Sequence, residues 1–149
     1  MPHVRVTAFL DAPVERVWAA HTDAERIPRW FPGVREVRDV NGPVDRPGAT
    51  YELRFNPLVL SRVEVTEVEK PVMHTRRWDA GPLGTHGTAT VLLRAEDDGT
   101  HVDLDVTYGL PLGAVGRWLE RRSLVRRRAA RDVRRELQSF ADFAERYPG

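Results

Sequence analysis

The chain has 149 residues, about the modal size of a single domain, and is 41% hydrophobic and 30% charged. These fractions are ordinary for a soluble globular protein, and no apolar run approaches the roughly 18 residues that a bilayer-spanning helix needs. The absence of cysteine excludes disulfides, thiolate catalysis and thiolate metal sites. The five histidines show no metal-ligand spacing, so the sequence predicts neither a metal site nor a cofactor.

The net charge of +1 conceals a local excess of arginine near the C-terminus. Nine arginines lie between Arg117 and Arg135, against only Glu120 and Asp132 as acidic residues. Such a stripe can contact nucleic acid or an anionic membrane surface. On an amphipathic helix a solvated charged face is the commoner explanation, so we expect no nucleic acid partner and no stable membrane insertion. A homodimer contact through this segment is an alternative.

The first thirty residues predict one strand followed by two short helices. Residues 3–10 alternate polar and apolar side chains, the period of a half-buried strand. Residues 11–13 offer a helix start, and a second short helix can be capped by Thr22 or Asp23 and is limited by the prolines of residues 28–32. The opening residues lack the features of a signal peptide, so the expected location is the cytoplasm.

Between residues 34 and 108 the pattern changes to about six strands separated by turns. Apolar residues alternate with polar ones, as in an antiparallel sheet that is covered on one face only. Glycine and proline mark the turns, at Asn41-Gly42-Pro43, Pro47-Gly48, Asn56-Pro57, Lys70-Pro71, Gly81-Pro82 and Asp97-Asp98-Gly99.

The last of these turns predicts a hairpin whose register can be read in two ways. A two-residue loop would place Ala89, Val91 and Leu93 beside the apolar row of residues 102–108. The alternative register uses Thr88, Thr90 and Leu92 and is less apolar.

After Gly113 the period becomes helical as far as Tyr147. At 100° per residue, the face that must lie on the sheet is formed by Val115, Leu119, Ala129, Val133, Leu137, Phe140 and Ala144.

These elements form an α+β order in which one helix must cover a whole sheet. Two local motifs accompany the order. Residues 12–18 read Ala-Pro-(two residues)-Arg-Val-Trp, and residues 23–30 read Asp-(six residues)-Trp. Together with the sequences at residues 64–71 and 99–108, they closely resemble the START-like superfamily. More narrowly, the chain resembles its bacterial polyketide cyclase/dehydrase branch, often called SRPBCC proteins.

The resemblance covers nearly the whole chain and implies one domain, residues 1–149, with a helix-grip fold. In that fold a curved antiparallel sheet of about seven strands surrounds a long C-terminal helix, with two short helices after the first strand. The resemblance also implies a deep cavity between sheet and helix, and such cavities are mostly apolar with a few polar groups. Members include lipid carriers, aromatase/cyclases, hydrolases and chaperone cofactors, so the motifs indicate the fold more specifically than the ligand.

The expected function is therefore binding of a hydrophobic or amphiphilic small molecule, such as a lipid, a quinone or a polyketide-like aromatic, in the cavity. The alternative is an aromatase/cyclase or dehydratase acting on a polyketide-like intermediate. For each candidate wall residue an ordinary core position is an equal alternative. The candidates are Trp30, Phe31, Tyr51, Leu53, Phe55, Trp78, Leu104, Val106, Tyr108, Trp118, Leu119 and Arg122.

Some of these positions carry a more specific expectation. Trp30 and Phe31 should lie at the cavity mouth, because an aromatic pair flanked by prolines on a short helix is hard to bury fully. In contrast, Val17, Trp18 and Val133 are assigned to the core at the closed end.

The catalytic candidates are His74, Arg76, His86 and Tyr51. His74 and Arg76 alternate with Trp78 along one strand. If this row faces inward, its imidazole and guanidinium could polarise a carbonyl or shuttle a proton during cyclisation or dehydration. If the other row of that strand faces inward, His74 and Arg76 lie in solvent. The alternation leaves both orientations open.

Arg122 and Arg126 fall within the apolar sector of the C-terminal helix, where an unpaired charge is costly. Either the helix bends near Ser123 and turns these residues outward, or their long side chains snorkel to the cavity mouth. A guanidinium at the mouth would suit an anionic group on an amphiphilic ligand.

Overall fold

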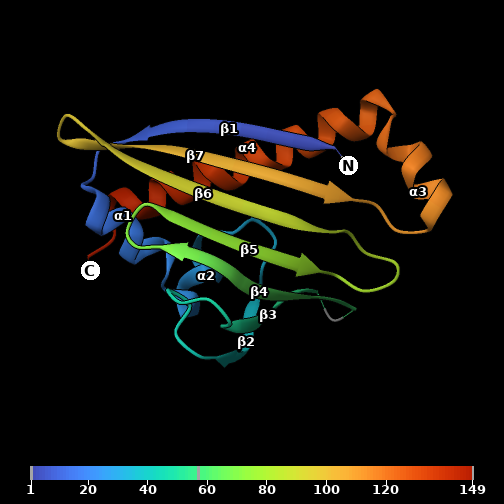
Figure 1. Cartoon of the computed structure of the whole chain (residues 1–149), viewed down its shortest axis with the longest axis horizontal. Helices are drawn as coiled ribbons and strands as arrows, with labels where there is room; N and C mark the ends of the chain where they lie inside the picture. Colours follow the sequence, from blue (N-terminus) through green and yellow to red (C-terminus); the bar gives the residue numbers. More distant parts are fainter. Residues whose placement is uncertain (1, 57, 149) are drawn as a thin grey trace.

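Seven strands form one curved antiparallel sheet in the order β1-β7-β6-β5-β4-β3-β2 (Figure 1). The computed structural model describes residues 2–56 and 58–148, so Met1, Gly149 and the proline of the predicted Asn56-Pro57 turn lie outside the described residues. The elements are β1 (His3–Leu10), α1 (Val14–His21), the 3₁₀ helix η1 (Ala24–Arg26), α2 (Ile27–Trp30), β2 (Glu36–Asn41), β3 (Thr50–Asn56), β4 (Val59–Glu69), β5 (Met73–Asp79), β6 (His86–Glu96), β7 (Gly99–Gly109), α3 (Gly113–Glu120) and α4 (Ser123–Glu145).

This order confirms the predicted helix-grip fold, and the β6–β7 hairpin has the more apolar of the two registers. Glu96 pairs with Gly99 across a two-residue loop, in which Asp97 adopts φ 54°, a left-handed conformation that aspartate tolerates. Along β6 and β7, every second side chain therefore points toward the concave face of the sheet. The buried pairs on that face are Ala89 with Val106, Val91 with Leu104, and Leu93 with Val102.

The two helical segments after β1 close one end of the sheet. In α1, Val14, Val17 and Trp18 are buried, as their helical spacing predicts. The helix starts at Pro13 without a side-chain cap, and the backbone N–H of Asp11 instead donates to the Glu145 carboxylate at 2.9 Å. The start of α1 and the end of α4 are therefore tied together at this end.

The C-terminal helical segment is not continuous, because the chain breaks into α3 and α4, and this confirms the bend near Ser123 that was one of the two explanations for Arg122 and Arg126. Arg122 has an extended backbone (φ −72°, ψ 132°) immediately before α4 begins at Ser123. The break turns Arg122 and Arg126 into solvent, which removes the cost of placing their charges against the sheet. The apolar sector then continues on α4 alone, where Val133, Leu137, Phe140 and Ala144 are buried.

α4 packs chiefly against β1 and α1, along one edge of the curved sheet (Figure 1). A single helix placed at that edge cannot fill the concave face above β3 to β6, so a space is left between helix and sheet. No helix in the described part of the chain is long and apolar enough to cross a membrane.

Candidate functional site

A cavity of about 760 Å³ lies between the concave face of the sheet and α4. Aliphatic and aromatic side chains form most of its wall, which makes it suitable for an apolar molecule. The wall residues from the sheet include Leu53, Phe55, Val63, Ala89 and Val106, and those from α4 include Val125, Ala129 and Val133.

The mouth of the cavity lies at the end of the sheet opposite α1. Phe55 reaches it from the end of β3, Val59 from the start of β4, Thr85 from the β5–β6 loop, and Leu110 from the segment that follows β7. The strand register places these connections together, because Arg54 pairs with Leu60, Asp79 with His86, and His86 with Gly109.

One ion pair lines the cavity. Arg76, on β5, donates to the Glu136 carboxylate of α4 at 2.9 Å, and both side chains are largely buried. Burial raises the pKa of the Glu136 carboxyl, and the Arg76 guanidinium opposes this shift. The pair fixes α4 against β5 and leaves the remaining guanidinium N–H groups as donors on the cavity wall.

Tyr108, at the end of β7, is buried and lines the cavity, but its hydroxyl has no hydrogen-bond partner among the described residues. Burial raises the pKa of this phenol, so it stays protonated and is a donor at neutral pH. A buried hydroxyl without a partner costs free energy. A ligand with an acceptor group would satisfy it.

Two buried histidines form a directional hydrogen-bond chain behind the cavity. His74 Nε2 lies 2.8 Å from the carbonyl oxygen of Val44, and His74 Nδ1 lies 3.2 Å from His21 Nε2. Because a carbonyl oxygen only accepts, His74 carries its proton on Nε2, so its Nδ1 accepts from His21. Both ring nitrogens of His74 are therefore occupied.

Both imidazoles are held neutral. Burial lowers the pKa of His74 to about 4, and the carbonyl of Val44 opposes part of this shift. Burial also lowers the pKa of His21 well below its usual value, with further lowering by His74 and Arg76.

The structure settles the orientation of β5. His74 and Arg76 are buried on the concave face, and the half-buried Trp78 lines the cavity. The Trp78 indole lies over Gly87 of β6, where an added Cβ would come within 2.7 Å of the ring. Its N–H donates to Thr85 at 3.2 Å, which fixes the indole at the mouth.

Several predicted wall residues line the cavity, and others do not. Phe31, Leu53, Phe55, Trp78, Val106 and Tyr108 line it. Tyr51 lies behind it, on a small recess shared with His74 and Arg76. Leu104 is buried in the core and lies outside the cavity lining.

The prediction that Trp30 lies at the cavity mouth is wrong. It is 4% exposed and packs edge-on against Phe140 of α4, with ring centroids 4.9 Å apart. The aromatic face of α4 therefore buries the residue that the flanking prolines suggested would be exposed. Phe31 lines the cavity as expected, whereas Val133, which we assigned to the core, is buried and also lines the cavity.

Trp118, Leu119 and Arg122 are outside the cavity because the break before α4 carries α3 away from the concave face. Trp118 is exposed, and the Arg122 guanidinium lies 5.0 Å from the centre of its ring. The prediction that these residues contact a cavity ligand depended on one continuous helix.

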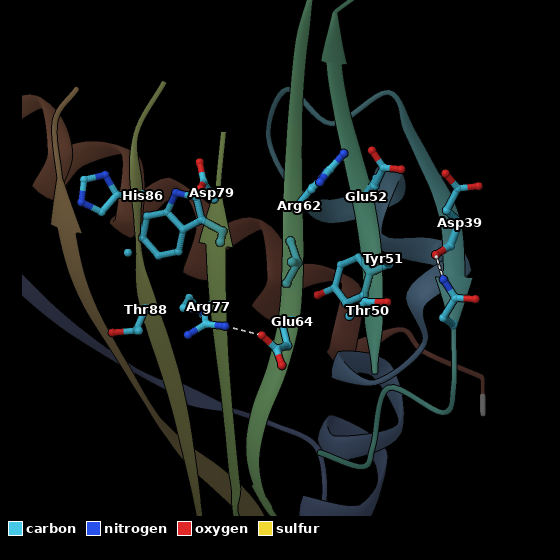
Figure 2. Close-up of a pocket in the computed structure, with 14 residues that line it drawn as sticks. Asp39, Thr50, Tyr51, Glu52, Arg62, Glu64, Arg77, Asp79, His86 and Thr88 are labelled. Atoms are coloured by element: carbon cyan, nitrogen blue, oxygen red, sulfur yellow. Dashed lines mark hydrogen bonds and ion pairs between the residues drawn. The ribbon is translucent and has the colours of Figure 1, made fainter. Parts of the chain in front are cut away.

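His86 lies on the opposite side of the sheet from His74 and Arg76. Figure 2 shows it with Thr88, Asp79 and Arg77 in a polar hollow on the outer face. The even-numbered residues of β6 point outward there, because Ala89 and Val91 point inward. The structure therefore brings His74, Arg76 and Tyr51 together but leaves His86 apart.

Sequence reasoning missed Glu136 and His21. At 100° per residue, Glu136 falls beside Val133 and Phe140 on the buried face of α4, so an acid in an apolar sector was the available signal. His21 lies seven residues after Val14 and four after Val17, a spacing that places it on the same buried face of α1. Neither signal names a partner, because the partners come from β5. The described residues contain no group of three or more side chains suited to hold a metal.

The family described as "Polyketide cyclase / dehydrase and lipid transport" matches residues 1–145. Among curated proteins, no significant sequence match was found. The aromatase/cyclase Zhui from Streptomyces sp. R1128 is 17% identical with a TM-score of 0.72, over 97% of this chain and 94% of that chain. TTHA0849 from Thermus thermophilus is 23% identical with a TM-score of 0.73, over 99% of this chain and 100% of that chain.

DynU16, from the dynemicin biosynthetic locus, is 22% identical with a TM-score of 0.71, over 97% of this chain. The alignment covers 47% of DynU16, so this chain spans about half the length of that protein. At these identities the structural likenesses support the fold alone.

Proposed function

Because the chain belongs to the polyketide cyclase/dehydrase and lipid transport family, we propose that its cavity binds one hydrophobic or amphiphilic small molecule. The unpartnered Tyr108 hydroxyl on the apolar cavity wall is the observation that carries this proposal. It favours a ligand with a large apolar body and a carbonyl, quinone or similar acceptor. The chain need not catalyse a reaction to perform this function.

The cavity supplies the apolar part of the binding energy, and Tyr108 and Arg76 orient the ligand. A volume of about 760 Å³ falls in the range of small-molecule sites and holds a lipid chain or a fused aromatic system. Binding to a cavity that is already formed avoids the cost of opening one. Apolar walls distinguish poorly among molecules of similar size, so the two donors would supply most of the selectivity.

Titration with a fluorescent aromatic amphiphile, anilinonaphthalene sulfonate, tests the proposal. Ala89 is buried on the cavity wall, so the Ala89→Phe variant should fill the site and reduce binding at least tenfold. Ala95→Phe, at an exposed position on the same strand, is the matched control and should bind as the wild type does. Equal binding by all three proteins would place the probe elsewhere and contradict the proposal.

A second candidate function is cyclisation or dehydration of a polyketide-like intermediate. Glu136 favours it, because a carboxyl with a raised pKa on the cavity wall can accept a proton from carbon. Arg76 would then stabilise the resulting enolate oxygen. His74 is not suited to this role, because both of its ring nitrogens are already hydrogen-bonded.

Turnover of a poly-β-ketone substrate distinguishes the two functions. A cyclase should lose at least a hundredfold in kcat when Glu136 is changed to Gln, while its KM changes little. A binding protein should hold the same substrate without converting it. Turnover that survives Glu136→Gln would remove the assigned base.

A further inference from the structure

Large apolar side chains are exposed around the mouth of the cavity. Leu58, Leu83 and Leu124 are 95%, 82% and 74% exposed, and Trp118 is 57% exposed. Leu112 and Val115 add two further exposed apolar residues, one just before α3 and one within it. Singly exposed leucines are common on protein surfaces, but here three of the six large apolar residues lie on connections, two lie on α3 and one lies at the start of α4.

These connections lie at one end of the molecule. The β3–β4 turn carries Leu58, the β5–β6 loop carries Leu83, and the segment after β7 leads into α3. Figure 1 shows these connections and α3 at the end opposite α1. The strand register that forms the cavity mouth therefore also places the apolar residues around it.

α3 is held beside this mouth. The Glu120 carboxylate accepts a hydrogen bond from the Leu110 backbone N–H at 3.0 Å, and Leu110 lines the cavity. Gly116 lets the helix approach the preceding segment, since an added Cβ would lie 2.1 Å from the carbonyl oxygen of Pro111. The exposed face of α3, with Val115 and Trp118, is thus fixed in position at the cavity mouth.

The nine arginines between Arg117 and Arg135 lie on α3, at the break before α4 and on the first half of α4, and all nine are exposed. Within the described ranges, none of them lies within 4.0 Å of a carboxylate. Arg122 instead stacks on the exposed ring of Trp118. The charge of this segment is therefore available to an external anion.

We propose that this end of the molecule, formed by α3, the first turns of α4 and the neighbouring loop tips, docks on an anionic lipid bilayer. Tryptophan and leucine are suited to the region between headgroups and acyl chains, and clustered arginines are attracted to anionic headgroups. The association is peripheral and reversible. The combination of apolar tips with unpaired arginines favours a lipid surface over nucleic acid, which would engage the charges and leave the leucines in water.

Docking in this orientation places the cavity mouth against the bilayer. A hydrophobic ligand could then enter or leave without crossing water. The membrane interaction goes beyond the proposed cavity binding and is tested separately from it, because the residues changed in the docking test, Arg121, Leu124 and Arg127, lie outside the cavity wall. The cavity-filled Ala89→Phe variant should accordingly bind vesicles as the wild type does.

Vesicle flotation tests the proposal. The wild type should float with phosphatidylcholine vesicles that contain about one third phosphatidylglycerol, and not with phosphatidylcholine alone. Raising the salt concentration from about 0.05 M to about 0.5 M should release most of it, because salt screens the headgroup charge. The double variant Arg121→Gln/Arg127→Gln should bind about 25-fold more weakly, about fivefold for each arginine.

Matched variants control for overall charge and surface hydrophobicity. Arg16→Gln/Arg38→Gln removes two exposed arginines elsewhere on the protein and should reduce binding much less. Leu124→Ser should weaken vesicle binding at least fivefold, whereas Leu92→Ser, on the outer face of β6, should not. Thermal unfolding of each variant verifies that it is folded.

Three flotation results would overturn the proposal. They are no flotation with anionic vesicles, equal flotation with neutral vesicles, and equal losses for the docking variants and their controls. Preferential binding of these same residues to a DNA duplex or to a second copy of the chain, in gel shift or ultracentrifugation, would also overturn it. If the Ala89→Phe variant still binds the amphiphile, the proposed cavity function is contradicted. That result would not affect the docking proposal.

Discussion

The polar side chains inside the fold fall into two groups according to whether their hydrogen bonds are satisfied. His74 and Arg76 each have a partner within the protein, which explains how polar groups persist in an apolar interior. The Tyr108 hydroxyl has none among the described residues, and the same holds for Arg54 Nε and for the indole N–H groups of Trp18 and Trp30. The satisfied hydrogen bonds of the first group stabilise the fold. In the second group Tyr108 lines the cavity, whereas Trp18, Trp30 and Arg54 do not, so its hydroxyl is the one best explained by a ligand.

Changing Tyr108 to Phe should separate stability from binding. Because the hydroxyl has no partner in the free protein, the free energy of unfolding should stay within about 1 kcal/mol of the wild type. Affinity for an acceptor-bearing ligand should fall about tenfold. Tyr147→Phe is the control, because its hydroxyl donates to Asp23 at 2.7 Å outside the cavity. The control should lose stability and keep binding, and the reverse pattern in urea unfolding and probe titration would contradict this assignment.

The Arg76–Glu136 pair should show strong coupling in a double-mutant cycle. Glu136→Leu leaves a buried guanidinium without a counter-charge and should lower the free energy of unfolding by about 3 kcal/mol. Arg76→Met should cost less, because the isolated carboxyl can take up a proton. The double variant should recover most of the loss, as measured by urea unfolding. Additive losses would mean that the two groups do not stabilise each other.

Acidification should destabilise the protein through the two buried histidines. In the unfolded chain their pKa values are near 6.5, whereas burial lowers that of His74 to about 4 and that of His21 well below its usual value. Below about pH 6.5 the unfolded chain therefore binds protons that the folded chain does not. Each histidine should reduce the free energy of unfolding by about 1.4 kcal/mol per pH unit, for His74 until about pH 4.

Urea unfolding between about pH 7.5 and pH 4.5 measures this slope. Glu136 acts in the opposite direction, because its raised pKa favours proton uptake by the folded state. Comparison with His74→Gln isolates the histidine contribution, and the variant should show the shallower slope. Identical slopes would show that His74 is not held neutral by the fold.

At the scale of elements, apolar periodicity predicted most of the fold. The β6–β7 register followed from the two-residue loop and the apolar row, because a shift by one residue would have exposed every core side chain. The inward face of β5 did not follow, since both of its rows mix polar and apolar residues. It is fixed by Glu136 on α4, which is distant in sequence from its partner Arg76.

Periodicity alone did not reveal the break in the C-terminal helix, because helical periodicity is nearly the same on its two sides. The charge at Arg122 and Arg126 was the only sequence signal for a break, and it also fitted a snorkelling side chain. Packing determines where the helix breaks, because α4 packs along β1 whereas α3 turns away from the sheet after the end of β7.

α3 should be less stable locally than the second half of α4. Only Gly116 is buried in α3, whereas Val133, Leu137, Phe140 and Ala144 are buried in α4. Amide hydrogen exchange should therefore be at least a hundredfold faster in α3 than in residues 133–144. Exchange measured by mass spectrometry tests this, and equal protection of both segments would contradict the packing described for α3.

At the scale of the whole molecule, the cavity follows from the mismatch between one helix and a seven-stranded sheet. Because α4 packs along the β1 edge, side chains from β3 to β6 face a space that no other element fills. The sequence-based resemblance implied such a cavity, but the composition of its wall depended on the helix break and on the orientation of β5. The ligand's identity does not follow from these walls, because apolar contacts discriminate weakly.

Native mass spectrometry of the protein purified from cells and reloaded with a cell lipid extract tests the cavity most directly. The account predicts that the wild type and Ala95→Phe carry one hydrophobic or amphiphilic molecule per chain, which organic extraction releases, and that Ala89→Phe carries none. A wild type that stays empty after reloading, or an Ala89→Phe variant that carries the same molecule, would contradict it.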